Sequence, residues 1–275
     1  MWVRPDICGM DVFPAWFLVS FAVLLGTVLG SFLNVVVARY PEGEPCTGRS
    51  HCPKCGSPIR ARHNIPVFGW VMLRGRCADC KDRISLRYPL VEVLTGVLFG
   101  AVVFTFGVEL FTVVLLVFAC MSVALALIDL DTMRLPNGIV LTVGPVVIAG
   151  SAVAGFLSSG WDGVIQVGVG AGATLAVYAL LWLVTLGRGL GLGDVKLAPT
   201  LGAVLGYFGF TAVMIGLAAS WILGAAVAVV GLIVGFVKPR QPFPFGPYLI
   251  AGTWVAVFAW QPISDWYLSL FGFGV

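Results

Sequence analysis

Long apolar runs separated by short polar loops dominate the chain. A bilayer core needs roughly 20 apolar residues per helix, and eight segments approach that length. We predict helices over residues 15–38, 89–106, 110–128, 138–157, 164–186, 195–208, 210–237 and 246–260. The sixth is short, and residues 262–275 are apolar but broken by glycines, a pattern compatible with an interfacial segment. The pattern predicts an all-α polytopic membrane protein with about eight transmembrane helices.

Composition supports this prediction. Charged residues make up 11% of the 275 residues and hydrophobic residues 59%, whereas soluble domains carry about 25% charged residues. These values argue against a soluble enzyme and a disordered protein, and the net charge of +3 is too small to indicate a nucleic-acid partner. The first apolar run is 24 residues long, longer than the roughly 7–15 apolar residues of a cleaved signal peptide. It is therefore expected to be a retained membrane span.

The basic residues predict the orientation. With eight spans, 15 of the 16 lysines and arginines fall in loops on one side, and only Arg4 falls on the other. Positively charged loops stay in the cytoplasm. We therefore expect both termini outside the cytoplasm and the loop from residue 39 to 88, which carries ten of these cations, inside it.

That loop differs from its flanks in being polar, basic and rich in cysteine. It contains two CxxC pairs separated by 21 residues, and these supply Cys52, Cys55, Cys77 and Cys80. Two such pairs can place four thiolates at the corners of a tetrahedron, the arrangement that zinc prefers. Gly56 follows the first pair and suits the tight turn. The sequence predicts a zinc-ribbon-like loop with a closed, structural metal site.

Other interpretations of the cysteines stay open. Disulfides disagree with a reduced cytoplasmic location, and a redox pair lacks a thioredoxin-like βαβ pattern. Unrelated free thiols are the third alternative. His51 and His63 could each replace a cysteine ligand, although a surface histidine is the simpler interpretation.

Acidic residues are sparse near the predicted spans. Asp129 ends the third helix and Asp194 opens the sixth, so the predicted topology puts both at the cytoplasmic face. Two facing carboxylates share a proton and can act as general base and general acid on an amide. Alternatively, each could be a helix cap or an ion-pair partner of Arg134 or Lys196. Asp131 is interpreted as a solvated helix end.

Several motifs resemble those of the bacterial type IV prepilin peptidases, a family of GxGD membrane aspartyl proteases. The stretch from Gly191 to Leu197 (GLGDVKL) resembles the second active-site motif, and Asp129 precedes Pro136-Asn137 at the spacing of the first, which usually ends Pro-Asp. Further similar stretches occur in the family's order at 30–36, 52–55 with 77–80, 64–66, 73–77, 84–92 and 244–248. The resemblance divides the chain into a first helix (1–38), a zinc-binding loop (39–88) and a multi-helix peptidase region (89–275).

The resemblance implies an enzyme of the bacterial inner membrane. Asp129 and Asp194 would remove the leader of prepilins or pseudopilins, the substrates of type IV pilus and type II secretion assembly, on the cytoplasmic side. Many relatives then methylate the new N-terminus with S-adenosylmethionine. No residue in the sequence specifies that second activity. Glu92 lies in the relevant stretch but is equally well interpreted as a charge at the membrane surface.

Two other functions are weighed against this one. A transporter with proton-relay aspartates would explain the spans but not the cysteine loop, and its carboxylates would lie near the bilayer midplane. A non-catalytic assembly factor would use the cysteine loop for docking but leaves both aspartates without a role.

Overall fold

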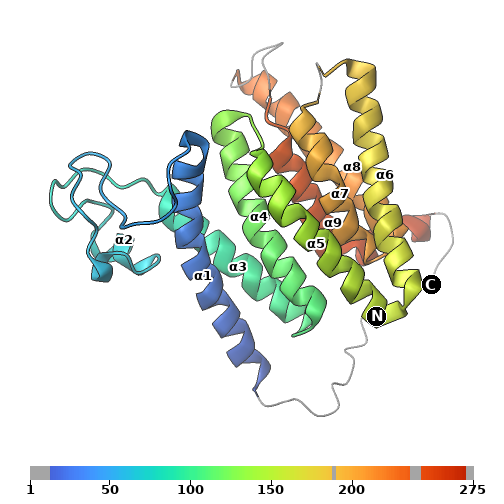
Figure 1. The fold of residues 1–275 in the computed structure, drawn as a ribbon, viewed down its shortest axis with the longest axis horizontal. Helices are drawn as coiled ribbons and strands as arrows, with labels where there is room; N and C mark the ends of the chain where they lie inside the picture. The colour runs from blue at the N-terminus through green and yellow to red at the C-terminus, as the bar shows by residue number, and fades with distance from the viewer. Residues whose placement is uncertain (1–12, 188–189, 236–242, 271–275) are drawn as a thin grey trace. The chain divides into compact units, whose positions relative to one another are not determined.

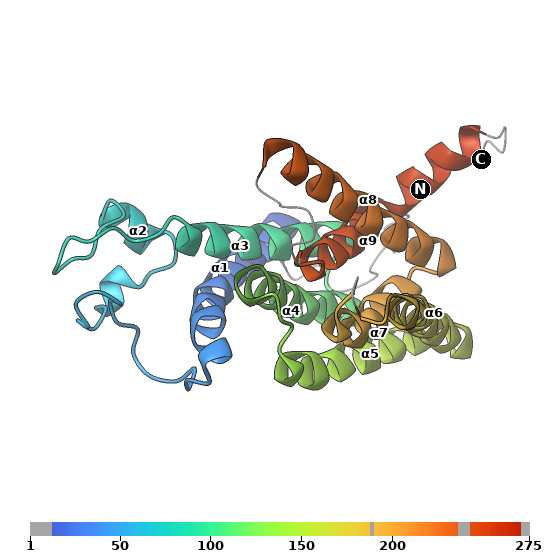
Figure 2. The same ribbon diagram turned by 90° about the horizontal axis from the view of Figure 1, so that it is seen from above.

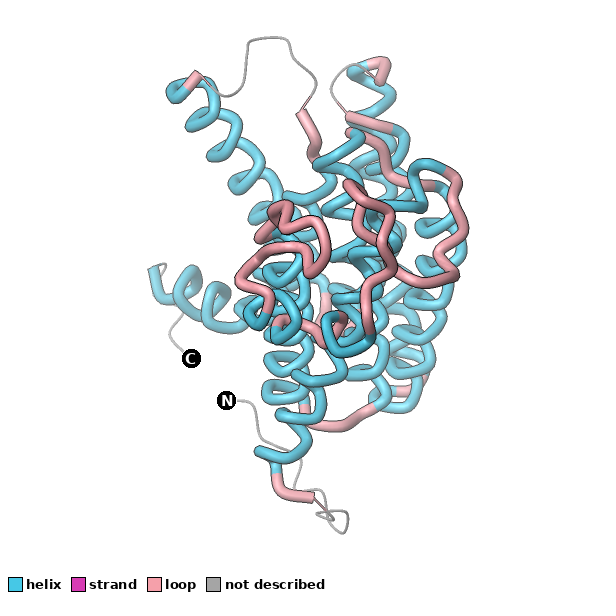
Figure 3. The backbone as a smooth tube through the Cα atoms, turned by 90° about the vertical axis from the view of Figure 1, so that its left-hand side faces the viewer, coloured by secondary structure: helices cyan, strands magenta, loops and turns pink. Residues whose placement is uncertain are grey.

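A computed structural model describes residues 13–187, 190–235 and 243–270, and these are helical apart from loops and turns (Figures 1 and 3). The long helices are α1 (Ala15–Arg39), α3 (Arg87–Phe106), α4 (Leu110–Thr132), α5 (Asn137–Ser159), α6 (Trp161–Thr185), α7 (Leu192–Gly206), α8 (Phe210–Val234) and α9 (Gly246–Leu270). Short elements η1 (Tyr40–Glu42), η2 (Ala61–His63) and α2 (Phe68–Met72) lie in the cysteine loop. The all-α prediction is confirmed, and each predicted segment corresponds to one long helix.

Six of these helices are long and apolar enough to cross a membrane: α1, α3, α4, α5, α6 and α8. Helix α7 has only 15 residues, and α9 carries Gln261, Pro262 and Asp265 in its second half. The chain is thus a multi-pass membrane protein with six candidate spans. Residues 262–270 continue α9 as helix, so the structure gives no separate segment there.

Glycine fixes the tightest connection between two spans. Gly160 is both the last cap of α5 and the first cap of α6, with φ +63°. Side chains rarely adopt this left-handed conformation, whereas glycine does so without steric cost. The two long helices therefore reverse direction within a single residue.

The chain divides into two compact units, residues 1–112 and 113–275. In the first, α1 and α3 pack closely (Figure 1). A Cβ added at Gly26 of α1 would lie 2.7 Å from the carbonyl oxygen of Thr95, and one added at Gly96 of α3 would lie 2.6 Å from Thr27. Small residues allow membrane helices to approach to backbone contact. The glycines here make the α1–α3 interface.

In the second unit, α7 is the central helix and packs against α5, α6, α8 and α9 (Figure 2). Gly202 of α7 lies against the backbone of Gly170 on α6, and Thr174 donates a hydrogen bond to the Ala198 carbonyl at 2.9 Å. The helices alternate in direction. Consequently the end of α4 and the starts of α5, α7 and α9 meet at one end of this unit.

Large apolar side chains cover the outer helices. Ile222 and Ile233 of α8 are 67% and 80% exposed. Only 17% of an apolar 18-residue stretch of this helix is buried inside the protein. An exposed surface of this kind suits a lipid environment, where no polar face is required. Hydrophobic packing against lipid thus explains why α8 has no hydrophilic side.

Candidate active site and cysteine cluster

Asp129 lies in the last turn of α4 and is 5% exposed. The backbone N–H of Gly246, the first residue of α9, donates to its Oδ2 at 3.1 Å. A Cβ at Gly246 would lie 2.7 Å from the same oxygen. Only a residue without a side chain lets the α9 backbone come this close to the carboxylate.

Asp194 is the third residue of α7 and is 7% exposed. Its Oδ2 accepts a hydrogen bond from the N–H of Gly191 at 3.2 Å, which satisfies a backbone donor at the helix start. This oxygen of Asp194 therefore caps the start of α7, as the helix-cap interpretation predicts. Helix α7 begins three residues earlier than predicted, so Asp194 sits within its first turn.

Contacts at the same end of the second unit bring the two aspartates together. The side chain of Leu135 lies against both Gly193, next to Asp194, and Gly246, which holds Asp129. The two carboxyl groups are close enough for the charge of Asp129 to act on Asp194. Segments 65 residues apart in the sequence thus form one site.

Each carboxylate keeps one oxygen available. Neither Oδ1 accepts a hydrogen bond from any residue that the structure describes, and neither aspartate forms an ion pair there. Lys196 instead donates to Oδ1 of Asn137 at 2.9 Å. The interpretation of Asp194 as the ion-pair partner of Lys196 is therefore wrong. Asn137, where related motifs usually have aspartate, ties the start of α5 to α7.

Two buried carboxylates of this kind suit acid–base chemistry. Two carboxylates at short range do not both ionise easily, and such a pair can share one proton. One member can then remove a proton from water while the other supplies one. Asp131, by contrast, is exposed beyond the site.

Aromatic residues that the sequence analysis did not single out support this site. Tyr178 of α6 is 2% exposed and lies close enough to Asp194 for the carboxylate charge to act on it. Its ring stacks on the ring of Trp221 of α8, with 6.4 Å between the ring centroids. The rings of Trp221 and Phe245 also lie together, with 5.3 Å between their centroids. This series connects the surroundings of Asp194 to the residue that precedes Gly246.

If the paired aspartates carry out catalysis, substituting Gly246 by alanine is expected to lower its rate about 10²-fold, because the added methyl group displaces Asp129 and small misplacements of a reacting group have effects of that size. Alanine can adopt the backbone conformation of Gly246, whose φ is not left-handed. Initial rates of substrate cleavage, measured in membranes with equal amounts of protein, check this expectation. Gly172→Ala on α6 is the matched control, since its Cβ would meet nothing within 4 Å. Cleavage by Gly246→Ala within twofold of the parent would show that the contact is unimportant.

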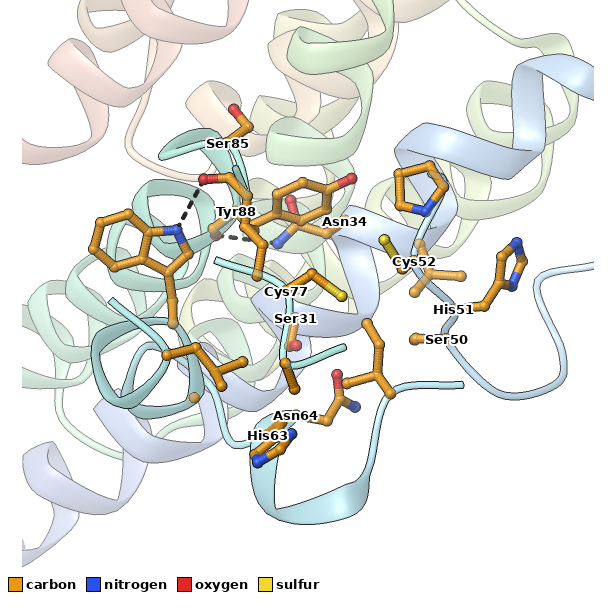
Figure 4. A pocket seen from close by; sticks show the side chains of 18 of the residues that line it. Ser31, Asn34, Ser50, His51, Cys52, His63, Asn64, Cys77, Ser85 and Tyr88 are labelled. Carbon is orange, nitrogen blue, oxygen red and sulfur yellow. Dashed lines mark hydrogen bonds between the residues drawn. The ribbon is translucent and has the colours of Figure 1, made fainter. Parts of the chain in front are cut away.

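The four predicted cysteines of the first unit form a cluster. The sulfur atoms of Cys52, Cys55, Cys77 and Cys80 all lie within 4.8 Å of one another. Figure 4 shows Cys52 and Cys77 facing each other across this part of the loop. No histidine belongs to the group among the residues described. The cluster could hold a metal ion, and its four sulfur ligands suit a closed tetrahedral site.

Two similar turns build the cluster. In the first, Gly56 donates its N–H to Cys52 O at 2.9 Å, and in the second Lys81 donates to Cys77 O at 3.1 Å. Both turn residues have positive φ, +70° at Gly56 and +62° at Lys81. The sequence indicated the glycine, but the lysine in the equivalent position gave no signal. Within the cluster, the hydrogen bond with Ser57 lowers the pKa of the Cys55 thiol to about 6, whereas burial and the other three thiols raise the pKa of Cys80.

A cavity of about 720 Å³ lies beside the cluster, within the first unit. Ser31 and Asn34 of α1 line one side, and Asn64 of the loop and Tyr88 of α3 also line it (Figure 4). Glu92 of α3 faces it and is 8% exposed. The side chain of Glu92 is therefore buried within the first unit and is not exposed to solvent.

The fold and site define a multi-pass helical membrane protein with a buried pair of carboxylates and a four-cysteine loop. Residues 24–106 match the Bacterial Peptidase A24 N-terminal domain, and residues 116–237 match the Type IV leader peptidase family. No solved structure matches the chain.

Curated relatives match over nearly the whole length. A protein of Aeromonas hydrophila named prepilin leader peptidase/N-methyltransferase is 38% identical over 93% of this chain and 96% of its own. Proteins of the same name from Pseudomonas putida and Neisseria gonorrhoeae are 38% and 34% identical, covering 94% and 91% of this chain and 96% and 95% of their own. The chain belongs to the type IV prepilin leader peptidase family. The transporter and the non-catalytic assembly factor are set aside on this ground.

Proposed function

We propose that this protein is a prepilin leader peptidase and N-methyltransferase, in which Asp129 and Asp194 cleave the leader of prepilins or pseudopilins. The observation that carries the proposal is the buried pair of carboxylates within the region that matches the leader peptidase family. The names of the relatives support both activities.

The proposed cleavage needs only groups that the second unit supplies. The ionised carboxylate removes a proton from a water molecule, whose oxygen attacks the scissile carbonyl carbon. The protonated carboxyl polarises the carbonyl oxygen and then gives its proton to the amide nitrogen, which leaves as a neutral amine. The first carboxyl keeps the proton taken from water, so the two groups have exchanged roles after one cleavage. Hydrogen bonds from Gly246 and Gly191 each hold one oxygen and leave the other for water or substrate.

We further propose that the four cysteines hold a structural zinc ion. Four sulfur ligands leave no open coordination position for water, so zinc would fold the loop rather than take part in the cleavage. Methyl transfer, if supplied by S-adenosylmethionine, replaces its carbon–sulfur bond by a carbon–nitrogen bond on the new N-terminal amine, which loses a proton.

The proposed topology follows from charge. Eight crossings, with α7 and α9 added to the six candidate spans, put the basic loops and both aspartates at the cytoplasmic face of the bacterial inner membrane. Both termini lie outside the described residues, as do four of the basic residues used to assign the orientation: Arg4, Arg188, Lys238 and Arg240. The division into 1–38, 39–88 and 89–275 is likewise a proposal. Accessibility of single introduced cysteines to a membrane-impermeant thiol reagent would test it.

Mass spectrometry of a prepilin after incubation with the purified protein tests the function. With S-adenosylmethionine present, the mature chain is expected to lack its leader and to be 14 Da heavier by one methyl group. Without it, the mass should correspond to cleavage alone. An uncleaved prepilin in both samples would contradict the proposed peptidase.

A further inference from the structure

One half-buried side chain in the second unit, that of Leu135, touches the surroundings of both aspartates. A Cβ added at Gly193, next to Asp194, would lie 2.9 Å from Leu135 Cβ and 3.4 Å from its Cδ1. A Cβ added at Gly246 would lie 3.5 Å from the other methyl group of this leucine, Cδ2. Glycine at both positions therefore lets two backbone segments lie directly against a single leucine side chain.

Each of these glycines is coupled directly to one carboxylate. The N–H of Gly246 donates to Oδ2 of Asp129 at 3.1 Å, and Gly193 precedes Asp194 in the first turn of α7. The two methyl groups of Leu135 thus contact the backbone segments that hold the two acid groups. Because protein interiors are close-packed and transmit displacements, the size of this side chain limits how near those segments come to each other.

The loop that carries Leu135 has little backbone freedom. Met133 leaves α4 in the left-handed conformation with φ +52°, and its N–H donates to the Asp129 carbonyl at 2.8 Å. Pro136 follows Leu135, and a residue before proline is largely restricted to extended conformations. The Pro136 carbonyl in turn accepts a hydrogen bond from the N–H of Val140 in α5 at 3.1 Å. The loop therefore holds Leu135 in a defined place.

A hydrogen bond ties the far end of this loop to α7. Nζ of Lys196, two residues after Asp194, donates to Oδ1 of Asn137 at 2.9 Å. The start of the loop is bonded to the last turn of α4 through Met133, and Leu135 lies midway along the chain between the two attachments. A loop attached at both ends and packed in its middle is suited to hold two helix ends at one separation.

We propose that Leu135 is a positioning residue for the cleavage, which sets the spacing between the carboxyl groups of Asp129 and Asp194 through Gly246 and Gly193. Its side chain carries no titratable group, so it acts through these two glycines and not by proton transfer. Spacing matters because both carboxyl groups must lie within hydrogen-bond reach of the reacting water and substrate. This inference rests on the proposed function and adds a residue to its machinery.

Steady-state cleavage of a prepilin by the purified full-length protein tests this role. Leu135→Ala removes both methyl contacts and is expected to lower kcat about 10²-fold with KM within about threefold, because it affects the acid groups and not substrate binding. Leu135→Ile keeps the volume and two carbon branches and should stay within about fivefold of the parent. Leu116→Ala, at a half-buried leucine nearer the other end of α4, is the matched control and should cleave like the parent.

The pH profile of kcat separates positioning from a simple loss of folded protein. Less folded protein would scale the profile without changing its shape. An altered spacing changes the interaction between the two carboxyl groups and, with it, the width of the profile. The proposal is overturned by a Leu135→Ala profile that superimposes on that of the parent after scaling, by a kcat within about threefold of the parent, or by an effect confined to KM. Leu135→Ile as slow as Leu135→Ala would overturn it as well.

A second measurement does not depend on cleavage. In the protein with Asp129→Cys and Asp194→Cys, adding Leu135→Ala is expected to lower the yield of the link formed by a short bifunctional thiol reagent, because the two positions are no longer held at one separation. Adding Leu116→Ala should leave the yield unchanged. An unchanged yield with Leu135→Ala contradicts the positioning role. A parent that does not cleave prepilin contradicts the proposed function, and the linkage yield then still decides whether Leu135 sets the spacing.

Discussion

Substituting Asp129 or Asp194 by asparagine is expected to reduce prepilin cleavage at least about 10³-fold. Asparagine keeps the size of the side chain and an acceptor for Gly246 or Gly191, but it can neither take up nor release a proton in the catalytic step. Initial rates with purified protein in detergent measure the effect. Loss of activity with a retained fold would assign the chemistry to the carboxyl groups themselves.

Two comparisons make this result specific. Asp131→Asn changes an exposed carboxylate two residues away and should cleave within about threefold of the parent. The double variant of Asp129 and Asp194 should be hardly slower than either single one, because residues that act as a unit are not additive. Independent, multiplying effects would mean that the two groups do not act as a pair.

Substituting Cys77 by serine is expected to abolish metal binding. Three remaining thiolates leave the tetrahedral site open, and structural zinc contributes about 10–16 kcal/mol of folding free energy in small zinc domains. Zinc measured by atomic absorption should fall from one per chain to nearly none. Limited proteolysis should cut between residues 39 and 88 in the variant and spare this stretch in the parent.

Cys46→Ser is the matched control, because Cys46 lies in the same loop but outside the cluster. It should keep one zinc per chain and resist proteolysis like the parent. A Cys77→Ser variant that retains one zinc per chain would contradict the four-cysteine site. A parent with much less than one zinc per chain under reducing conditions would do the same.

The helices could be predicted because a bilayer imposes a minimum length of apolar sequence. The ends of α1 and α3 lie within two residues of the prediction. The larger errors have local causes. Helix α4 continues past the buried Asp129 to Thr132, since its last three residues are exposed and tolerate charge, and α9 continues through Pro262 to Leu270. Hydropathy alone gives no signal for helix that leaves the apolar region.

The two aspartates could be predicted because the distribution of basic residues among the loops puts both of their helix ends at the same face of the membrane. The contacts that hold the two carboxylates in place could not be predicted. Gly246 is 117 residues from the aspartate it contacts, and Tyr178 reaches the site only through packing of α6. The motif around Gly246 was visible, but the hydrogen bond that makes this glycine important depends on three-dimensional proximity. Long-range contacts of this kind leave no pattern in one sequence.

In the cysteine loop, spacing predicted the cluster because metal ligands constrain it. Lys81 was missed because residues other than glycine rarely occupy a left-handed turn. Glu92 was given no more weight as a functional residue than as a surface charge, since a carboxylate near a helix start usually faces solvent. Its burial follows from the loop that folds back over α3 through Val67.

Chemical cross-linking of cysteines placed at positions 129 and 194 tests the central claim most directly. The double variant Asp129→Cys with Asp194→Cys is treated with a short bifunctional thiol reagent in membranes, and the linked peptides are mapped by mass spectrometry. The proximity of the two carboxyl groups predicts an intramolecular link between 129 and 194, and much less link when Asp131→Cys replaces Asp129→Cys. Equal linkage at 131, or none at 129, would contradict the account.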